Sequence, residues 1–230
     1  MKNFLSFLAL ILFSILQSQE LKDFTIPKRY EKILETKGDL DKDGKDETVI
    51  VFNSDKKIKS DFQNGFKREF FILKNINGKL KIWHKNTSVL LASETGFYPE
   101  YNPKPEFIIK NGTLKIIQNF NTNSRHTQTY ENIFRFQNND FYLIGSKNEF
   151  NDTCEFNTSD EINFSTKKVI VAREYTYDCF EENPEYKNES FDKEFTFPFK
   201  SIPKMNTFTP GEKSYKIPNF KDENFGYFGY

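Results

Sequence analysis

Several residue types that commonly carry enzyme chemistry are scarce in this chain. Its 230 residues include two cysteines and two histidines. The histidines, His84 and His126, stand far apart, and the sequence holds no GxSxG, no HExxH and no cysteine–histidine nucleophile pattern. Each histidine is interpreted as an exposed strand residue rather than as a base. The sequence therefore predicts no catalytic residue, and an enzyme is the less favoured functional class.

An excess of charge and long apolar runs are also missing. The 33 basic and 33 acidic residues balance, which gives no reason to expect a nucleic-acid partner. The chain starts with Met1-Lys2-Asn3 and an apolar run over residues 4–16, which is typical of a signal peptide. We expect residues 1–18 to be removed, with Gln19 as the alternative last residue. No later run is long enough to span a membrane, so a periplasmic or extracellular protein is expected.

An acidic loop precedes an apolar strand at residues 48–52. Residues 39–47 read Asp-Leu-Asp-Lys-Asp-Gly-Lys-Asp-Glu, with carboxylates at positions 1, 3, 5 and 9 and glycine at position 6. Calcium takes several oxygen ligands, which the carboxylates at this spacing supply. The glycine permits the sharp turn that brings them around one ion. The loop is not an EF-hand, because position 12 is Ile50 rather than glutamate. The alternative interpretation is a solvated turn without metal.

The loop resembles the calcium loop of FG-GAP and VCBS repeats, in which a strand follows the acidic residues. The resemblance implies a structural Ca²⁺ site. Its side-chain ligands would be Asp39, Asp41, Asp43 and Glu47, and the backbone carbonyl of Lys45 would complete the set. Glutamate at position 9 departs from the commoner aspartate. No second copy of the loop occurs, so a multi-bladed propeller is not predicted.

Apolar segments separated by turn residues predict β-hairpins. The turns are Asn111-Gly112, Asn138-Asn139 and the segment 75–78. No segment keeps helical spacing over three turns, so any helices should be short. The predicted fold class is mainly β: an antiparallel hairpin meander arranged as a sandwich, an open barrel or partial propeller-like sheets. We expect a calcium-loop β domain over residues 19–200 and an irregular tail over residues 201–230.

The two cysteines are placed by a predicted hairpin. With a turn at Thr166-Lys167, Ile162 faces Val171, Asp160 faces Arg173, and Cys154 faces Cys179. A structural disulfide between Cys154 and Cys179 is expected in an oxidising compartment.

Two further segments carry expectations about binding. The aromatic and glycine-containing end, residues 224–230, is expected to be disordered rather than to dock a partner. Residues 124–130 form the best candidate for a ligand-facing patch, although an ordinary exposed strand face is the favoured interpretation.

The whole arrangement resembles a group of uncharacterised exported bacterial proteins, which brings no known activity. The matching pieces are residues 38–47, 134–145 and 162–166. Our first hypothesis is a non-enzymatic, calcium-stabilised β module that binds an unknown protein or glycan. The alternatives are a periplasmic inhibitor or immunity protein, and a secreted hydrolase whose site residues are dispersed.

Overall fold

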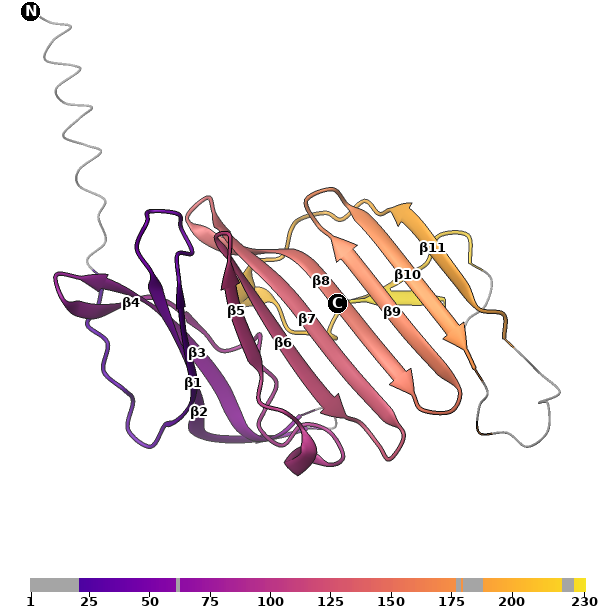
Figure 1. Cartoon of the computed structure of the whole chain (residues 1–230), viewed down its shortest axis with the longest axis horizontal. Coiled ribbons are helices and arrows are strands. Elements are labelled where there is room, and N and C mark those ends of the chain that lie inside the picture. The colour runs from indigo at the N-terminus through magenta and orange to yellow at the C-terminus, as the bar shows by residue number, and fades with distance from the viewer. Residues whose placement is uncertain (1–20, 61–62, 177–178, 180–187, 221–225) are drawn as a thin grey trace, which may run out of the picture.

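The fold is described from a computed structural model covering residues 21–60, 63–176, 179, 188–220 and 226–230. The predicted signal peptide lies outside these residues. The described chain is a series of antiparallel strands, which confirms the predicted mainly β meander (Figure 1). Its helical turns within these ranges are two short 3-10 helices, η1 (Pro99–Tyr101) and η2 (Met205–Thr207). Nowhere in the described ranges is there a helix with the length and apolar character needed to cross a membrane.

The first sheet has four strands in the order β1-β2-β3-β4. Their bounds are Glu31–Gly38, Glu47–Lys59, Asn64–Ile76 and Lys79–Asn86. The central strands are buried on both faces. One face joins the main core, while Phe24 and Tyr30 cover the other, where Phe52 and Phe71 pack together. Burial on both sides explains why residues 49–52 form an unbroken apolar run rather than an alternating one.

The second sheet has seven strands in the order β11-β10-β9-β8-β7-β6-β5. In chain order from β5 to β11 they are Glu106–Lys110, Thr113–Asn121, His126–Gln137, Asp140–Asp152, Phe156–Asn163, Lys168–Tyr175 and Phe191–Thr196. Every second residue of β6 is buried, as expected for a strand with one face on the core. The sheet therefore has an inner face and an outer face.

The tight turns follow the predicted chemistry. Asn111 and Gly112 have φ values of 55° and 71°, and Asn138 and Asn139 have values of 50° and 60°. Positive φ at both central positions defines the turn that matches the twist of a two-residue hairpin. The β3–β4 turn is narrower than the predicted segment, because Ile76 already pairs with Lys79.

The predicted register of the β9–β10 hairpin is wrong by two residues. Ile162 pairs with Val169 rather than with Val171, and a four-residue connection over 164–167 replaces the two-residue turn. Phe164 leaves the strand pairing because its side chain is buried in the core. The Asn163 side chain closes the connection by accepting a hydrogen bond from the Thr166 N–H at 3.1 Å.

The predicted disulfide is present despite the wrong register. Cys154 and Cys179 are bonded, with their Cα atoms 5.0 Å apart. Both cysteines lie beyond the paired parts of β9 and β10, so the pairing within the strands does not decide their distance. The disulfide ties Cys179, which follows β10, to the connection between β8 and β9.

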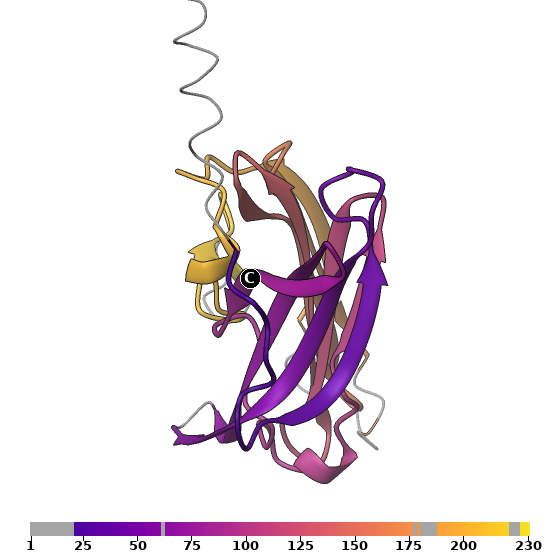
Figure 2. The same ribbon diagram turned by 90° about the vertical axis from the view of Figure 1, so that its left-hand side faces the viewer.

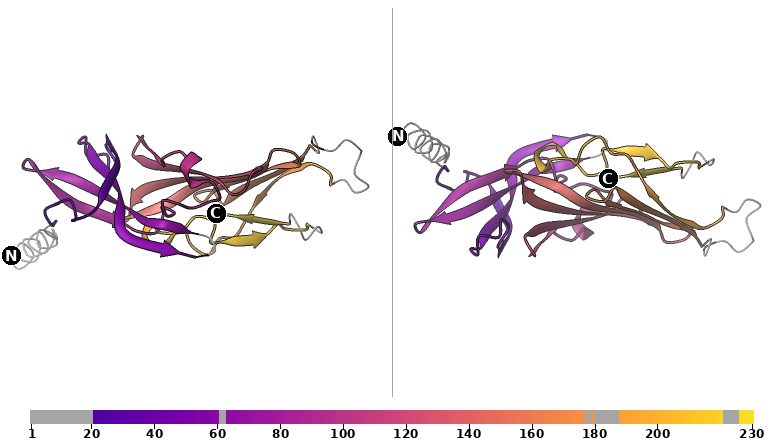
Figure 3. Two further views of the ribbon diagram at one scale, coloured as in Figure 1. Left: turned by 90° about the horizontal axis from the view of Figure 1, so that it is seen from below. Right: turned by 90° about the horizontal axis from the view of Figure 1, so that it is seen from above.

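The C-terminal segment covers the inner face of the seven-stranded sheet. Its short strands β12 (Ser214–Lys216) and β13 (Tyr227–Gly229) pair with each other. Figures 2 and 3 show this segment as a layer along one face of the larger sheet. The tail expected to be irregular over residues 201–230 is irregular in much of 201–213, but it also contains the strands β12 and β13. The expected disorder of the aromatic end is wrong for residues 226–230, because Phe228 and Tyr230 are buried in the main core.

Candidate functional site

The acidic loop connects β1 to β2 and brings three predicted ligands together. One carboxylate oxygen from each of Asp39, Asp41 and Asp43 lies within 4.8 Å of the others. Oxygen ligands sit about 2.3–2.6 Å from calcium, so two of them around one ion can be up to roughly 5 Å apart. The three aspartates therefore fit a common calcium ion in both chemistry and spacing.

Backbone hydrogen bonds shape this loop. The Asp39 carboxylate accepts from the N–H of Lys42 at 2.6 Å and from the N–H of Gly44 at 3.0 Å. The Asp43 carboxylate accepts from the N–H of Lys45 at 2.8 Å. Gly44 has a φ of 83°, a conformation that glycine adopts without strain. These contacts turn the aspartates toward the inside of the loop. The Lys45 carbonyl remains a predicted ligand.

Glu47, the fourth predicted side-chain ligand, does not join the three aspartates. Its side chain is 2% exposed, and Oε2 accepts a hydrogen bond from the Leu40 N–H at 2.8 Å. Burial raises the pKa of Glu47, a rise that the Leu40 hydrogen bond opposes. In this geometry the glutamate closes the base of the loop. Its carboxylate is not part of the cluster formed by the three aspartates.

Sequence reasoning missed a lysine at this site. The ammonium group of Lys74, on β3, contacts the Asp41 carboxylate and lies 3.9 Å from Glu47 Oε1. The same group lies over the Trp83 ring, 4.2 Å from its centroid. Thr48 pairs with Leu73, so the register continued by one residue places Lys74 opposite Glu47. The lysine becomes visible only once the pairing of β2 with β3 is known.

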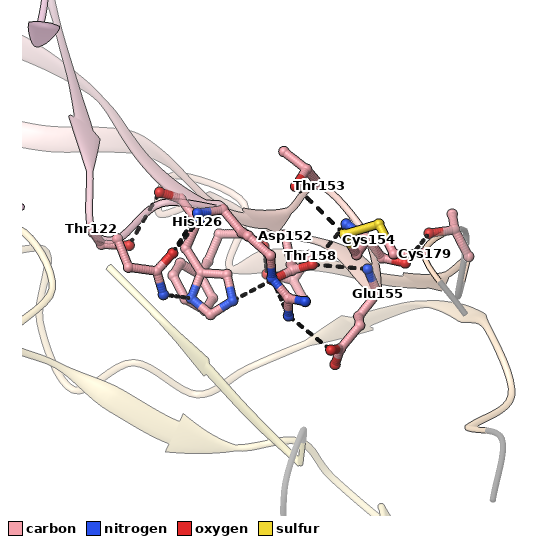
Figure 4. A network of polar contacts seen from close by, with 12 residues as sticks. Thr122, His126, Asp152, Thr153, Cys154, Glu155, Thr158 and Cys179 are labelled. Atoms are coloured by element: carbon pink, nitrogen blue, oxygen red, sulfur yellow. Dashed lines mark hydrogen bonds and ion pairs between the residues drawn. A yellow bond between two sulfur atoms is a disulfide. The ribbon is translucent and has the colours of Figure 1, made fainter. Parts of the chain in front are cut away.

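His126 belongs to a polar network at the start of β7 (Figure 4). The Asn123 side-chain oxygen accepts from the N–H groups of Arg125 and His126, so its amide nitrogen faces His126 Nδ1 at 2.8 Å. Nδ1 is then the acceptor, and Nε2 carries the proton toward Asp152 Oδ2 at 2.5 Å. Both ring nitrogens are engaged, so His126 has no free lone pair for a substrate proton.

Asp152 anchors this network. Its side chain is fully buried, which opposes ionisation. The N–H groups of Cys154 and Glu155 and the charge of Arg125 outweigh that effect, so the pKa of Asp152 lies below its usual value. The network joins the β6–β7 connection to the residues beside the disulfide. The contacts of this network hold these two segments together.

His84 is also less exposed than predicted. It lies in β4 and packs edge-on against Phe141, with ring centroids 4.9 Å apart. Burial lowers its pKa. Both histidines are strand residues, as predicted, but neither lies on a fully exposed face: the His126 side chain is only 24% exposed.

The predicted ligand-facing patch contributes to a cavity of about 290 Å³. Gln128 and Tyr130 lie on its β7 side, and Phe97 lies in the connection between β4 and β5. Phe97 is 60% exposed, and Tyr98 and Tyr101 next to it are 39% and 74% exposed. The Phe97 and Tyr98 rings are in contact, with centroids 4.6 Å apart. We call residues 97–101 the aromatic loop. No role was predicted for this loop, although its three aromatic residues within five positions are evident in the sequence.

Comparisons with family models, curated proteins and solved structures found no match.

Proposed function

We propose that this protein is an exported, non-enzymatic β module that calcium stabilises and that binds a protein or a glycan. The observation that carries the proposal is the convergence of the Asp39, Asp41 and Asp43 carboxylates in one loop. Three carboxylates held close together repel one another unless a cation lies between them. Calcium bound there would supply that charge, and the three aspartates would hold it. The disulfide is consistent with an oxidising compartment.

The position of the loop explains why a cation would stabilise the whole fold. Gly38, at the end of β1, packs so closely on Ile109 of β5 that a Cβ on Gly38 would lie 2.5 Å from the isoleucine side chain. The Lys42 side chain likewise packs on Gly112 in the β5–β6 turn. The loop thus lies where the edges of the two sheets meet. Fixing its conformation would fix that junction.

The aromatic loop is the surface that best suits a binding partner. Exposed aromatic rings offer large contact areas at a small entropy cost, and tyrosine adds a hydroxyl for hydrogen bonding. Phe97 and Tyr101 are the two most exposed of these rings. The cavity beside them is lined by uncharged residues, which suits a neutral sugar or an uncharged peptide side chain.

The calcium part of the proposal is tested by thermal unfolding. Millimolar calcium should raise the melting temperature above that in EDTA, because a ligand that binds only the folded loop stabilises it by mass action. The Asp41→Ala, Asp43→Ala double variant should lose the rise. Asp46→Ala is the matched control, because Asp46 is an exposed acidic residue of the same loop but not a predicted ligand. Equal melting curves in calcium and EDTA for the wild-type protein would overturn this part.

The binding part is tested by capture from periplasmic and culture fractions and by a glycan array, both with calcium present. The wild-type chain should retain a partner that the Phe97→Ala, Tyr101→Ala double variant loses. A His84→Phe, His126→Gln double variant should retain it. If only the histidine variant lost the partner while remaining folded, the binding part of the proposal would be wrong, and an active site around the two histidines would be indicated.

A further inference from the structure

A second cavity, of about 500 Å³, lies within the C-terminal segment. This volume is in the range of small-molecule sites, roughly 300–1,000 Å³. Aromatic rings make up much of its wall, and they come from the chain after β11, from β12 and from the residue that follows β13. They are Phe197, Phe199, Phe208, Tyr215 and Tyr230. The cavity is separate from both the acidic loop and the aromatic loop.

The wall of this cavity is held in place by packing. Phe208 is 2% exposed and Tyr230 is 5% exposed. Their rings stack with centroids 6.0 Å apart, and the ring of Phe197 contacts that of Phe199 at 4.9 Å. The Tyr230 N–H also donates to the Lys213 carbonyl at 3.1 Å. Because the rings are fixed by the fold, an apolar ligand would enter a preformed site.

Polar groups at the cavity favour an anion. Lys200 and Lys213 are exposed lining residues that form no ion pair with the described residues, and Glu212 is likewise unpaired there. The three together leave one net positive charge. The hydroxyls of Tyr215 and Tyr230 lie 3.2 Å apart, so one O–H donates to the other and one donor is left over. Burial raises the pKa of Tyr230, which keeps its phenol neutral near pH 7.

We propose that this cavity binds a small amphipathic monocarboxylate, with its apolar body among the aromatic rings and its carboxylate toward the lysines. The rings supply apolar contact area, and the two ammonium groups supply charge at the exposed edge. A neutral analogue would gain only the apolar part. A cationic analogue would gain contact with the rings but would be repelled by the lysines. The site thus discriminates by the charge of the head group.

The proposal is tested with three ligands of equal chain length. Isothermal titration calorimetry on the full mature protein compares octanoate, 1-octanol and octyltrimethylammonium. We expect octanoate to bind at least tenfold more tightly than octanol, and the cation to bind most weakly. Ring resonances of the lining aromatic residues should shift on titration with octanoate. Equal affinity for all three ligands, or no binding of octanoate, would overturn the proposal.

Two variants locate the site. Lys200→Gln with Lys213→Gln changes only exposed side chains, and it should weaken octanoate binding about tenfold while leaving octanol binding unchanged. Lys216→Gln is the matched control, because Lys216 is an exposed lysine on β12 that does not line the cavity. Thr209→Trp should fill the cavity and abolish binding of all three ligands. Octanoate binding that survives in both the double lysine variant and the folded tryptophan variant would place the ligand elsewhere and reject the assignment.

Discussion

Lys74 and Asp41 are in contact at the acidic loop, with the ammonium group on one of the three carboxylates of the aspartate cluster. The chain thus supplies one cation of its own at the site where calcium is proposed. Lys74 also lies 3.9 Å from Glu47, so it balances part of the negative charge at the base of the loop. Calcium and the lysine would compete for the Asp41 oxygens. This competition makes the metal affinity adjustable by a residue that is not a ligand.

Replacing Lys74 with methionine should therefore strengthen calcium binding several-fold, up to about tenfold, because the competing charge is removed. The same variant should be less stable than the wild type in EDTA by about 1–3 kcal/mol, since Asp41 and Glu47 lose a partner. Calorimetric titration and denaturant unfolding measure the two effects. Lys45→Met is the control that removes a loop charge without removing this contact. Weaker calcium binding by Lys74→Met would show that the lysine assists the site instead of competing.

The contact between Gly38 and Ile109 should make the sheet junction sensitive to a single methyl group. An added Cβ on Gly38 would lie 2.5 Å from the isoleucine Cγ2, so Gly38→Ala should destabilise the protein by about 1–3 kcal/mol. Ile109→Ala removes Cγ2, the nearest obstructing atom, and leaves the isoleucine Cβ position at 2.8 Å. The double variant should then lose less stability than the sum of the two single changes, by at least about 0.5 kcal/mol. Additive losses in a double-mutant cycle would mean that the two residues do not touch.

The hairpin turns could be predicted from the sequence because their conformation is decided locally. Asn111-Gly112 and Asn138-Asn139 tolerate positive φ, and that property selects the turn whatever the rest of the chain does. The prediction of the β9–β10 register was wrong because a contact with a distant part of the chain decides that register. Phe164 reaches the core and its N–H donates to the Ile144 carbonyl at 3.0 Å, which is information from another strand.

The candidate sites show the same difference between features decided by neighbouring residues and features decided by distant ones. The three aspartates lie within five consecutive positions, so their spacing alone predicts that they converge. Lys74 is 33 residues from Asp41 and enters the loop only through the pairing of β2 with β3. Burial of Phe228 likewise depends on a surface formed by other strands: Arg173 donates to the Tyr227 carbonyl at 2.8 Å, and Asp160 accepts from the Gly229 N–H at 2.9 Å. The glycine-containing composition of residues 226–230 gave no sign of that surface.

Opening the disulfide should destabilise the protein by about 3 kcal/mol. The bond joins residues 25 positions apart, and cross-linking a loop of that size restricts the unfolded chain. Cys154→Ser with Cys179→Ser should lower the midpoint of denaturant unfolding accordingly. Mass spectrometry of the exported protein without reductant should show the two cysteines joined. The single variant Arg125→Gln, which loosens the adjoining network but keeps the bond, should cost less. A double cysteine variant as stable as the wild type would contradict a structural role for the bond.

Tyr130 should make the fold sensitive to alkaline pH. The side chain is 5% exposed, and burial raises its pKa from 10.0 to about 12. Below pH 10 the phenol is neutral in both the folded and the unfolded chain, and its contribution to stability is fully present. As the pH rises from 10 to 12, the unfolded chain loses the proton first, so the free energy of unfolding falls by on the order of 2 kcal/mol from this residue.

Tyr130→Phe should remove that part of the alkaline loss. At pH 7 the variant should unfold within about 1 kcal/mol of the wild type, because the deleted hydroxyl forms no hydrogen bond with the described residues and the ring remains packed. Guanidinium unfolding at pH 8, 10 and 11.5 measures both effects. Tyr101→Phe, at a side chain that is 74% exposed, should keep the wild-type pH dependence. If Tyr130→Phe shows the same fall in stability between pH 10 and 11.5 as the wild type, the Tyr130 phenol is not protected from ionisation by its place in the core.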